Sequence, residues 1–255
     1  MIQADMNAKQ INAKYLRRAK IIASILSFAP YVWMIGLTGS LARGEATEKS
    51  DIDFFIVTKT NRLWTGRALV SILTHLSGYR RYDGKIAGRI CLNCYQTEDR
   101  LIIGPKNIKN AKDYANIKIL YQSHGLAKRF IEANRWISDK GYQFITARNT
   151  LRSLPQGCKR RYIASKGTPC AFGAGSFINI DPKAGGNIVA SFLRWISEAL
   201  YELILNNWGE KRLRSFQIRR ILADPRTQIA SQGQIYISDQ ELRFHPHTKT
   251  DENLD

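Results

Sequence analysis

Two aspartates stand two residues apart at the start of an apolar run, in the segment Ser50-Asp-Ile-Asp-Phe-Phe-Ile-Val57. Alternate side chains of a strand leave the same face, roughly 6.6 Å apart at a rise of about 3.3 Å per residue. The spacing predicts that Asp51 and Asp53 share one face while Ile52 and Phe54 face the core. Two carboxylates on one rigid face suit hard divalent cations, Mg²⁺ or Mn²⁺, which neutralise charge on phosphate oxygens.

A glycine-containing turn precedes these aspartates, in the segment Leu37-Thr-Gly-Ser-Leu-Ala-Arg-Gly44. Gly39 permits a positive φ and a close backbone approach, and the N–H groups that follow it can point at an anion. Ser40 offers a hydroxyl donor, and Arg43 offers charge-assisted hydrogen bonds to phosphate. Because Ser40 lies eleven residues before Asp51, the two segments together predict a triphosphate site beside a metal site.

The elements that must hold these residues follow from the apolar spacing around them. Residues 7–28 have the pattern of an amphipathic helix, and Ser77-Gly78 ends a second helical pattern at 62–76. Runs typical of buried strands cover 31–37, 52–58 and 90–96. The sequence therefore predicts an α+β fold, a mixed sheet flanked by helices.

The remainder of the chain is predicted to be less regular at first and then helical. Residues 114–136 have helical spacing, and Gly and Pro are frequent between 140 and 186. Further patterns predict helices at 188–208 and 210–223 and a short strand at 234–237. We expect a core at 1–139, an irregular basic connector at 140–186, a mainly helical C-terminal region at 187–248 and a tail at 249–255.

The charge balance favours a polyanionic partner. Lys and Arg number 39 against 21 Asp and Glu, a formal net charge of +18. Such a balance bears on association and not on fold, and nucleic acid is the partner it favours. The basic runs at 159–161 and 211–220, with Tyr162, Trp208 and Phe216 nearby, are candidates to bind phosphates and stack bases. A merely solvated helix face is an equal alternative.

The four cysteines fit a reducing cytoplasm, because nothing else in the chain is typical of a disulfide scaffold. Cys91 and Cys94 form a CxxC pair, but the run around them alternates like a strand, so packed thiols are favoured over a zinc or redox pair. Residues 21–42 contain no charge, yet Pro30 and the turn at Gly39 argue against a membrane span.

The motif GSLARG followed by SDID resembles that of the polymerase-beta-like nucleotidyltransferase superfamily, and most of all that of its minimal prokaryotic members. The motif covers about twenty residues, and the compatible order of elements extends over residues 7–95. The resemblance implies that Gly39 and Ser40 contact a triphosphate and that Asp51 and Asp53 are the first two metal-binding carboxylates.

The superfamily usually supplies a third carboxylate from a later strand, and here the sequence departs from that pattern. The candidate strand at 90–95 offers Asn93, whose amide can ligate a cation but cannot act as a general base. Asp83, Glu98 and Asp99 are alternatives, but all three lie in predicted turns.

Two functions follow. The first is an enzyme that moves a nucleoside monophosphate from a nucleoside triphosphate to a hydroxyl of nucleic acid or protein and releases pyrophosphate. Aminoglycosides are disfavoured as acceptors, because they are cations and the protein has a formal net charge of +18. The second is a catalytically weak or inactive module that binds nucleotide or RNA, or a separate protein partner as an antitoxin does. A fused toxin is not expected, since Arg, four to six residues and His do not occur in that order.

Overall fold

The computed structural model describes residues 2–82, 84–142, 144, 196, 198–200, 202, 206–225, 227 and 235–244. Most of the predicted connector at 140–186, the basic run at 159–161, Asp83 and the predicted tail lie outside the described residues, as does much of the helix predicted at 188–208. The divisions predicted at 139, 186 and 248 therefore stay predictions.

A six-stranded mixed sheet forms the centre of the fold, in the order β4-β1-β2-β3-β6-β5. Among the strands that the structure describes, β2 and β3 pair in parallel and every other neighbouring pair is antiparallel. The strands are β1 Val32–Thr38, β2 Ile52–Thr58, β3 Ile90–Thr97, β4 Lys118–Gln122, β5 Tyr236–Ile237 and β6 Glu241–Arg243. The predicted α+β fold is confirmed.

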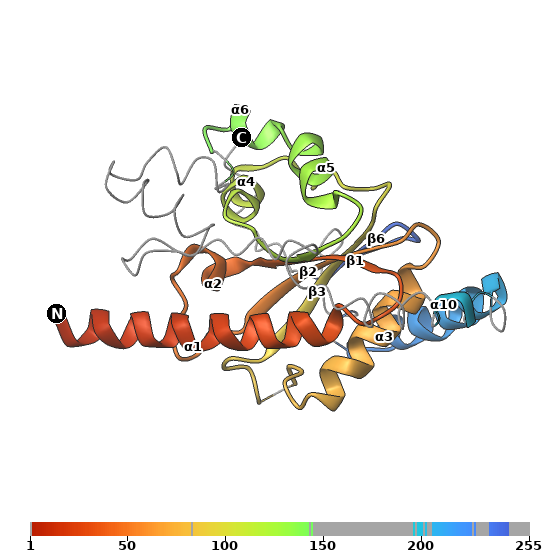
Figure 1. Cartoon of the computed structure of the whole chain (residues 1–255), viewed down its shortest axis with the longest axis horizontal. Helices are drawn as coiled ribbons and strands as arrows, with labels where there is room; N and C mark the ends of the chain where they lie inside the picture. The colour runs from red at the N-terminus through yellow and green to blue at the C-terminus, as the bar shows by residue number, and fades with distance from the viewer. Residues whose placement is uncertain are drawn as a thin grey trace.

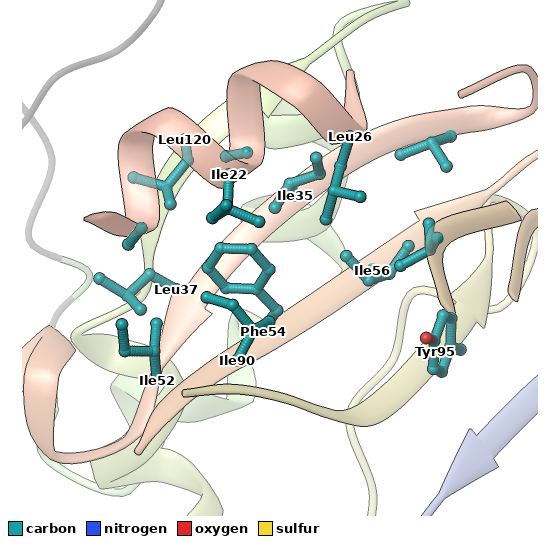
Figure 2. Close-up of a cluster of buried hydrophobic side chains, with 14 of the residues drawn as sticks. Ile22, Leu26, Ile35, Leu37, Ile52, Phe54, Ile56, Ile90, Tyr95 and Leu120 are labelled. Atoms are coloured by element: carbon teal, nitrogen blue, oxygen red, sulfur yellow. The ribbon is translucent and has the colours of Figure 1, made fainter. Parts of the chain in front are cut away.

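Helices cover both faces of this sheet (Figure 1). The helices of one face are α1 (Ile2–Leu26) and α3 (Leu63–Leu76), and those of the other are α4 (Ile108–Ala115), α5 (Leu126–Ala133) and α6 (Trp136–Asp139). Strand β2 is apolar on both sides for this reason. Phe54 and Ile56 join the core beneath α1, whereas Phe55 and Val57 join the opposite core. Figure 2 shows Ile22 of α1 over Phe54 in the first of these cores.

The helical spacing at 114–136 is a wrong prediction over part of its length. Helix α4 ends at Ala115, and β4 then pairs antiparallel with β1 as an outer strand of the sheet. Leu120 packs toward α1 while Ile117 and Ile119 pack on the other side. A run this short is compatible with either a helix or a strand, and hydrogen bonding to β1 makes it a strand.

The C-terminal region contributes a helix and two strands to the same structure. Helix α10 (Asn206–Leu222) packs on α3 and includes most of the helix predicted at 210–223. Glu210 of α10 accepts hydrogen bonds from the backbone N–H groups of Trp64 and Thr65, which begin α3. Strand β6 was not predicted, and it pairs with β3 in the central sheet. No helix among the described residues is long and apolar enough to cross a membrane.

Candidate active site

The turn after β1 brings a backbone against a carboxylate. Gly39 begins α2 (Gly39–Arg43) with φ +70°, and Gly44 ends this short helix with φ +78°. A Cβ atom at Gly39 would lie 2.3 Å from Asp53 Oδ2. Thr38 and Asp53 are partners in the β1–β2 ladder, which explains the close approach. A residue with a side chain cannot take the place of Gly39 without moving Asp53.

We expect Gly39→Ala to lower stability by about 1–2 kcal/mol from its left-handed backbone alone, and in addition to displace the Asp53 carboxylate. Gly44→Ala is the matched control, because Gly44 has a similar φ but no heavy atom within 4 Å of its virtual Cβ. Urea unfolding and Mn²⁺ titration of both variants test this expectation. Equal Mn²⁺ affinity in the two variants would show that the contact with Asp53 has no consequence.

The two carboxylates come together as their spacing predicts. Asp51 immediately precedes β2 and Asp53 is its second residue, while Ile52 between them is buried in the core beneath α1. Carboxylate oxygens of Asp51 and Asp53 and the sulfur of Cys91 all lie within 4.8 Å of one another. Among the described residues, no other His, Cys, Asp or Glu joins this group.

Cys91 enters the group because β3 runs parallel to β2, with Cys91 paired to Asp53. The register then shifts, so that Cys94 rather than Asn93 is paired with Phe55. Asn93 lies in this irregularity, and its backbone carbonyl accepts a hydrogen bond from Phe244 N. A role for Asn93 as third ligand stays a prediction. Cys94 is a packed thiol in the opposite core, as the alternation predicted.

The Asp51 and Asp53 carboxylates lie close together and are partly buried, which makes it unfavourable for both to be negatively charged. Burial raises the pKa of Asp53 to about 7, and the charge of Asp51 adds to this effect. Arg81 opposes the rise: its Nη1 donates to Asp51 Oδ2 at 2.6 Å and to Cys91 Sγ at 3.2 Å. Burial also raises the pKa of the Cys91 thiol, and the two aspartates reinforce that rise. The group therefore favours an added positive charge.

Arg43 is held by acidic neighbours. Its Nε lies 2.7 Å from Glu45 Oε2, and its Nη1 pairs with Asp113 of α4. Triphosphate binding by Arg43 stays a prediction, and it would require Arg43 to exchange these partners. Asp113 also adds a small repulsion that raises the pKa of Asp53, so α4 brings another carboxylate toward the site.

Comparison with protein families gives a match to the nucleotidyltransferase domain over residues 19–121. Residues 19–121 are therefore similar to a nucleotidyltransferase domain. The matched segment runs from α1 to the penultimate residue of β4 and contains Gly39, Asp51, Asp53 and Cys91. Comparisons with curated proteins and with solved structures give no match. The resemblance first suggested by the GSLARG and SDID segments is confirmed at the level of the superfamily.

Nucleotidyltransferase domains generally use a divalent metal, and the two carboxylates fit one. Their oxygens lie close together, and burial first and repulsion from Asp51 second raise the pKa of Asp53, a cost of ionisation that a cation would offset. Cys91 fits Mg²⁺ poorly, because magnesium prefers oxygen ligands. The oxygen pair is thus the part of this nucleotidyltransferase domain that suits a hard cation.

Sequence reasoning missed three residues around the carboxylates of this nucleotidyltransferase domain: Cys91, Arg81 and Asp113. The Cys91 position could have been found from a parallel β2–β3 pairing, which a helix between two strands favours. Arg81 lies in the loop before β3, and Asp113 lies on a helix far along the chain. No local pattern marks either of these two as part of the site.

Proposed function

We propose that this protein is a metal-dependent nucleotidyltransferase that moves a nucleoside monophosphate from a nucleoside triphosphate to a hydroxyl of a nucleic acid, releasing pyrophosphate. The observation that carries the proposal is the Asp51–Asp53 pair against the Gly39 turn, within a matched nucleotidyltransferase domain.

Each site residue has a stated task in this proposal. Asp51 and Asp53 would hold Mg²⁺ or Mn²⁺, which when bound neutralises charge on the phosphate oxygens. The backbone N–H groups that follow Gly39 would point at a phosphate, and the half-buried Ser40 hydroxyl would donate to a phosphate oxygen. Asp51 keeps its partner Arg81 only while no stronger cation competes for the carboxylate.

The acceptor is proposed from the charge of the chain and from the outer face of α10. Trp208, Arg212, Phe216 and Arg220 recur every four residues and so form a stripe along this helix. Trp208 and Phe216 are 61% and 56% exposed as residues, and the Arg212 guanidinium lies 4.7 Å from the Trp208 ring centroid. We call these four residues the α10 stripe. Exposed aromatic rings alternating with cations suit the bases and phosphates of a single strand.

The cations of this face are available to phosphate. Among the described residues, no carboxylate pairs with Arg212, Arg220 or the neighbouring Lys211, whereas Arg214 pairs with Asp239. Helix α10 lies at the end of the molecule away from α2 (Figure 1). An acceptor that contacts both the α10 stripe and the carboxylates must therefore be long, which supports a polymer over a small molecule.

Removing the α10 stripe is expected to weaken single-stranded RNA binding. Trp208→Ala with Phe216→Ala should lower affinity at least about 30-fold, since stacking contributes about 1–3 kcal/mol per base and two rings are removed. Arg212→Gln with Arg220→Gln should reduce the slope of log affinity against log salt by about 1.4, for two lost phosphate contacts.

The matched control is Lys14→Gln with Arg17→Gln, which removes the same charge from an exposed part of α1. Fluorescence anisotropy with a labelled oligonucleotide at several salt concentrations makes both measurements. If the α1 and α10 variants lose affinity equally, only the net charge matters and the α10 stripe is not the binding surface.

Purified protein with each labelled nucleoside triphosphate, Mg²⁺ or Mn²⁺, and RNA, DNA or protein as acceptor tests the proposed activity. Label transferred to RNA or DNA with release of pyrophosphate is the expected result. Label transferred only to protein would retain nucleotidyl transfer and replace the acceptor. The absence of transfer to every acceptor would remove the enzymatic proposal.

A nucleotide-binding or RNA-binding module of low or absent activity is the second candidate, including one that acts through a separate protein partner. It is favoured by the thiol of Cys91, since within the described ranges no third carboxylate joins Asp51 and Asp53. Binding of a triphosphate with metal, without transfer in the same assay, would make this candidate the better account.

A further inference from the structure

The group that completes the carboxylate pair is a thiol. Cys91 is 2% exposed, and its sulfur and the carboxylate oxygens of Asp51 and Asp53 lie within 4.8 Å of one another. Asp53 lies on β2, Cys91 lies on the adjacent parallel strand β3, and Asp51 immediately precedes β2. The central sheet therefore fixes the backbones of all three residues. Two hard oxygen donors therefore face one soft sulfur donor.

A cation of the protein already contacts two of these three side chains. One nitrogen of Arg81, Nη1, lies 2.6 Å from Asp51 Oδ2 and 3.2 Å from Cys91 Sγ. The Arg81 side chain is 41% exposed, so it can turn into solvent when another cation binds. The position between the carboxylate and the sulfur thus attracts positive charge, independently of the family match that implies a divalent metal.

We propose that Asp51, Asp53 and Cys91 together form a three-ligand site that prefers a thiophilic divalent cation, of the Zn²⁺ class, over Mg²⁺. Thiolate ligands select zinc-like ions, whereas magnesium takes oxygen ligands almost exclusively. A protein with a carboxylate at position 91 would lack this preference. The proposal concerns metal binding and does not rest on the proposed transfer of nucleotides.

The geometry needs a small adjustment. In a tetrahedral zinc site with bonds near 2.3 Å to sulfur and 2.0 Å to oxygen, neighbouring ligand atoms lie roughly 3.5 Å apart. The ligand atoms now lie within 4.8 Å of one another, so metal binding would require the two aspartate side chains to move closer to the Cys91 sulfur. Three protein ligands leave the fourth position for water or a phosphate oxygen. The Cys91 sulfur forms the bond to the cation as its proton passes to solvent.

Titration of the full chain with Co²⁺ tests the site without any assay of activity. A cobalt–sulfur bond adds a ligand-to-metal charge-transfer band in the near ultraviolet, which cobalt bound by oxygen alone lacks. We expect this band in the parent protein and expect Zn²⁺ to abolish it at a concentration at least ~100-fold lower than Mg²⁺.

Cys91→Ser should lose the band and bind Co²⁺ at least ~100-fold more weakly, the upper end of the effect of losing even an outer-shell partner. Cys94→Ser is the matched control: Cys94 lies on the same strand, but its sulfur packs in the opposite core beside Tyr114. A band that survives Cys91→Ser, or that disappears with Cys94→Ser alone, would overturn the proposal. Equal competition by Mg²⁺ and Zn²⁺ would overturn the stated preference.

A second variant keeps the test decisive if Cys91→Ser does not fold. Asp51→Ala with Asp53→Ala retains Cys91 and removes both oxygen ligands, so the charge-transfer band should again disappear. A band that persists in this variant would show that the cobalt–sulfur bond forms without the two carboxylates and would refute the three-ligand site. Transfer without a charge-transfer band refutes only the zinc preference, and a band without transfer refutes only the proposed function.

Discussion

Asp51→Asn together with Asp53→Asn is expected to reduce nucleotidyl transfer by at least about 1,000-fold, because a bound cation stabilises the transition state by several kcal/mol. The fold should remain, since neither carboxylate is in the hydrophobic core and the amides have nearly the same shape. Label transfer to RNA, measured with circular dichroism of the same samples, checks both statements.

Glu132→Gln together with Asp139→Asn is the matched control, because it neutralises two exposed carboxylates on α5 and α6. This control should transfer nucleotide as the parent does. Undiminished transfer by the Asp51 and Asp53 variant would mean that the cations are held elsewhere. The assignment of both aspartates would then be wrong.

The part of the fold nearest the motif could be predicted because its elements are stabilised locally. Helix α1, strands β1 and β2, helix α3 and strand β3 all have apolar periods that match their burial. The glycine turn and the paired aspartates could be predicted from the sequence for a related reason. Their spacing along the chain is short, and a strand converts a spacing of two residues into a shared face.

The missed elements depend on contacts between distant segments. Strand β4 forms at the edge of β1 because its apolar residues pack into the cores on both faces of the sheet. Leu120 joins the core beneath α1, and Ile117 and Ile119 join the opposite core. Strand β6 has only three residues, and its partner β3 lies far earlier in the chain. A run this short contains too little periodicity to distinguish strand from helix.

The place of Cys91 beside the aspartates also depends on such contacts. The strand pattern at 90–95 predicts Asn93 as the inward polar residue and Cys91 as a packed thiol. The register shift between Asp53 and Phe55 breaks this pattern and leaves Cys91 beside Asp53. Sequence periodicity does not predict an irregularity of this kind, because it arises from how two strands and their cores fit together.

Asp53 is also expected to make the metal-free protein less stable as pH rises. Its folded pKa of about 7 lies above the ordinary 3.8, so the folded state holds the proton more tightly than the unfolded state. The resulting stabilisation is complete below about pH 4 and is lost as pH rises through 7. Asp53→Asn has no such proton to lose, and its amide oxygen can still accept the Cys91 hydrogen bond.

At pH 8 Asp53→Asn should therefore exceed the parent in free energy of unfolding by on the order of 4 kcal/mol more than it does at pH 4. Urea denaturation of both proteins in chelator, at several pH values between 4 and 8, measures this difference. Groups that do not interact with Asp53 cancel in the comparison, whereas Asp51, Arg81 and Cys91 interact with Asp53 and contribute to the measured difference. A difference independent of pH would show that Asp53 is ionised throughout, with the Cys91 hydrogen bond and Arg81 offsetting its burial and the repulsion from Asp51. Added Mn²⁺ should stabilise the parent at pH 8 far more than the variant, because the cation replaces the proton on the same carboxylate.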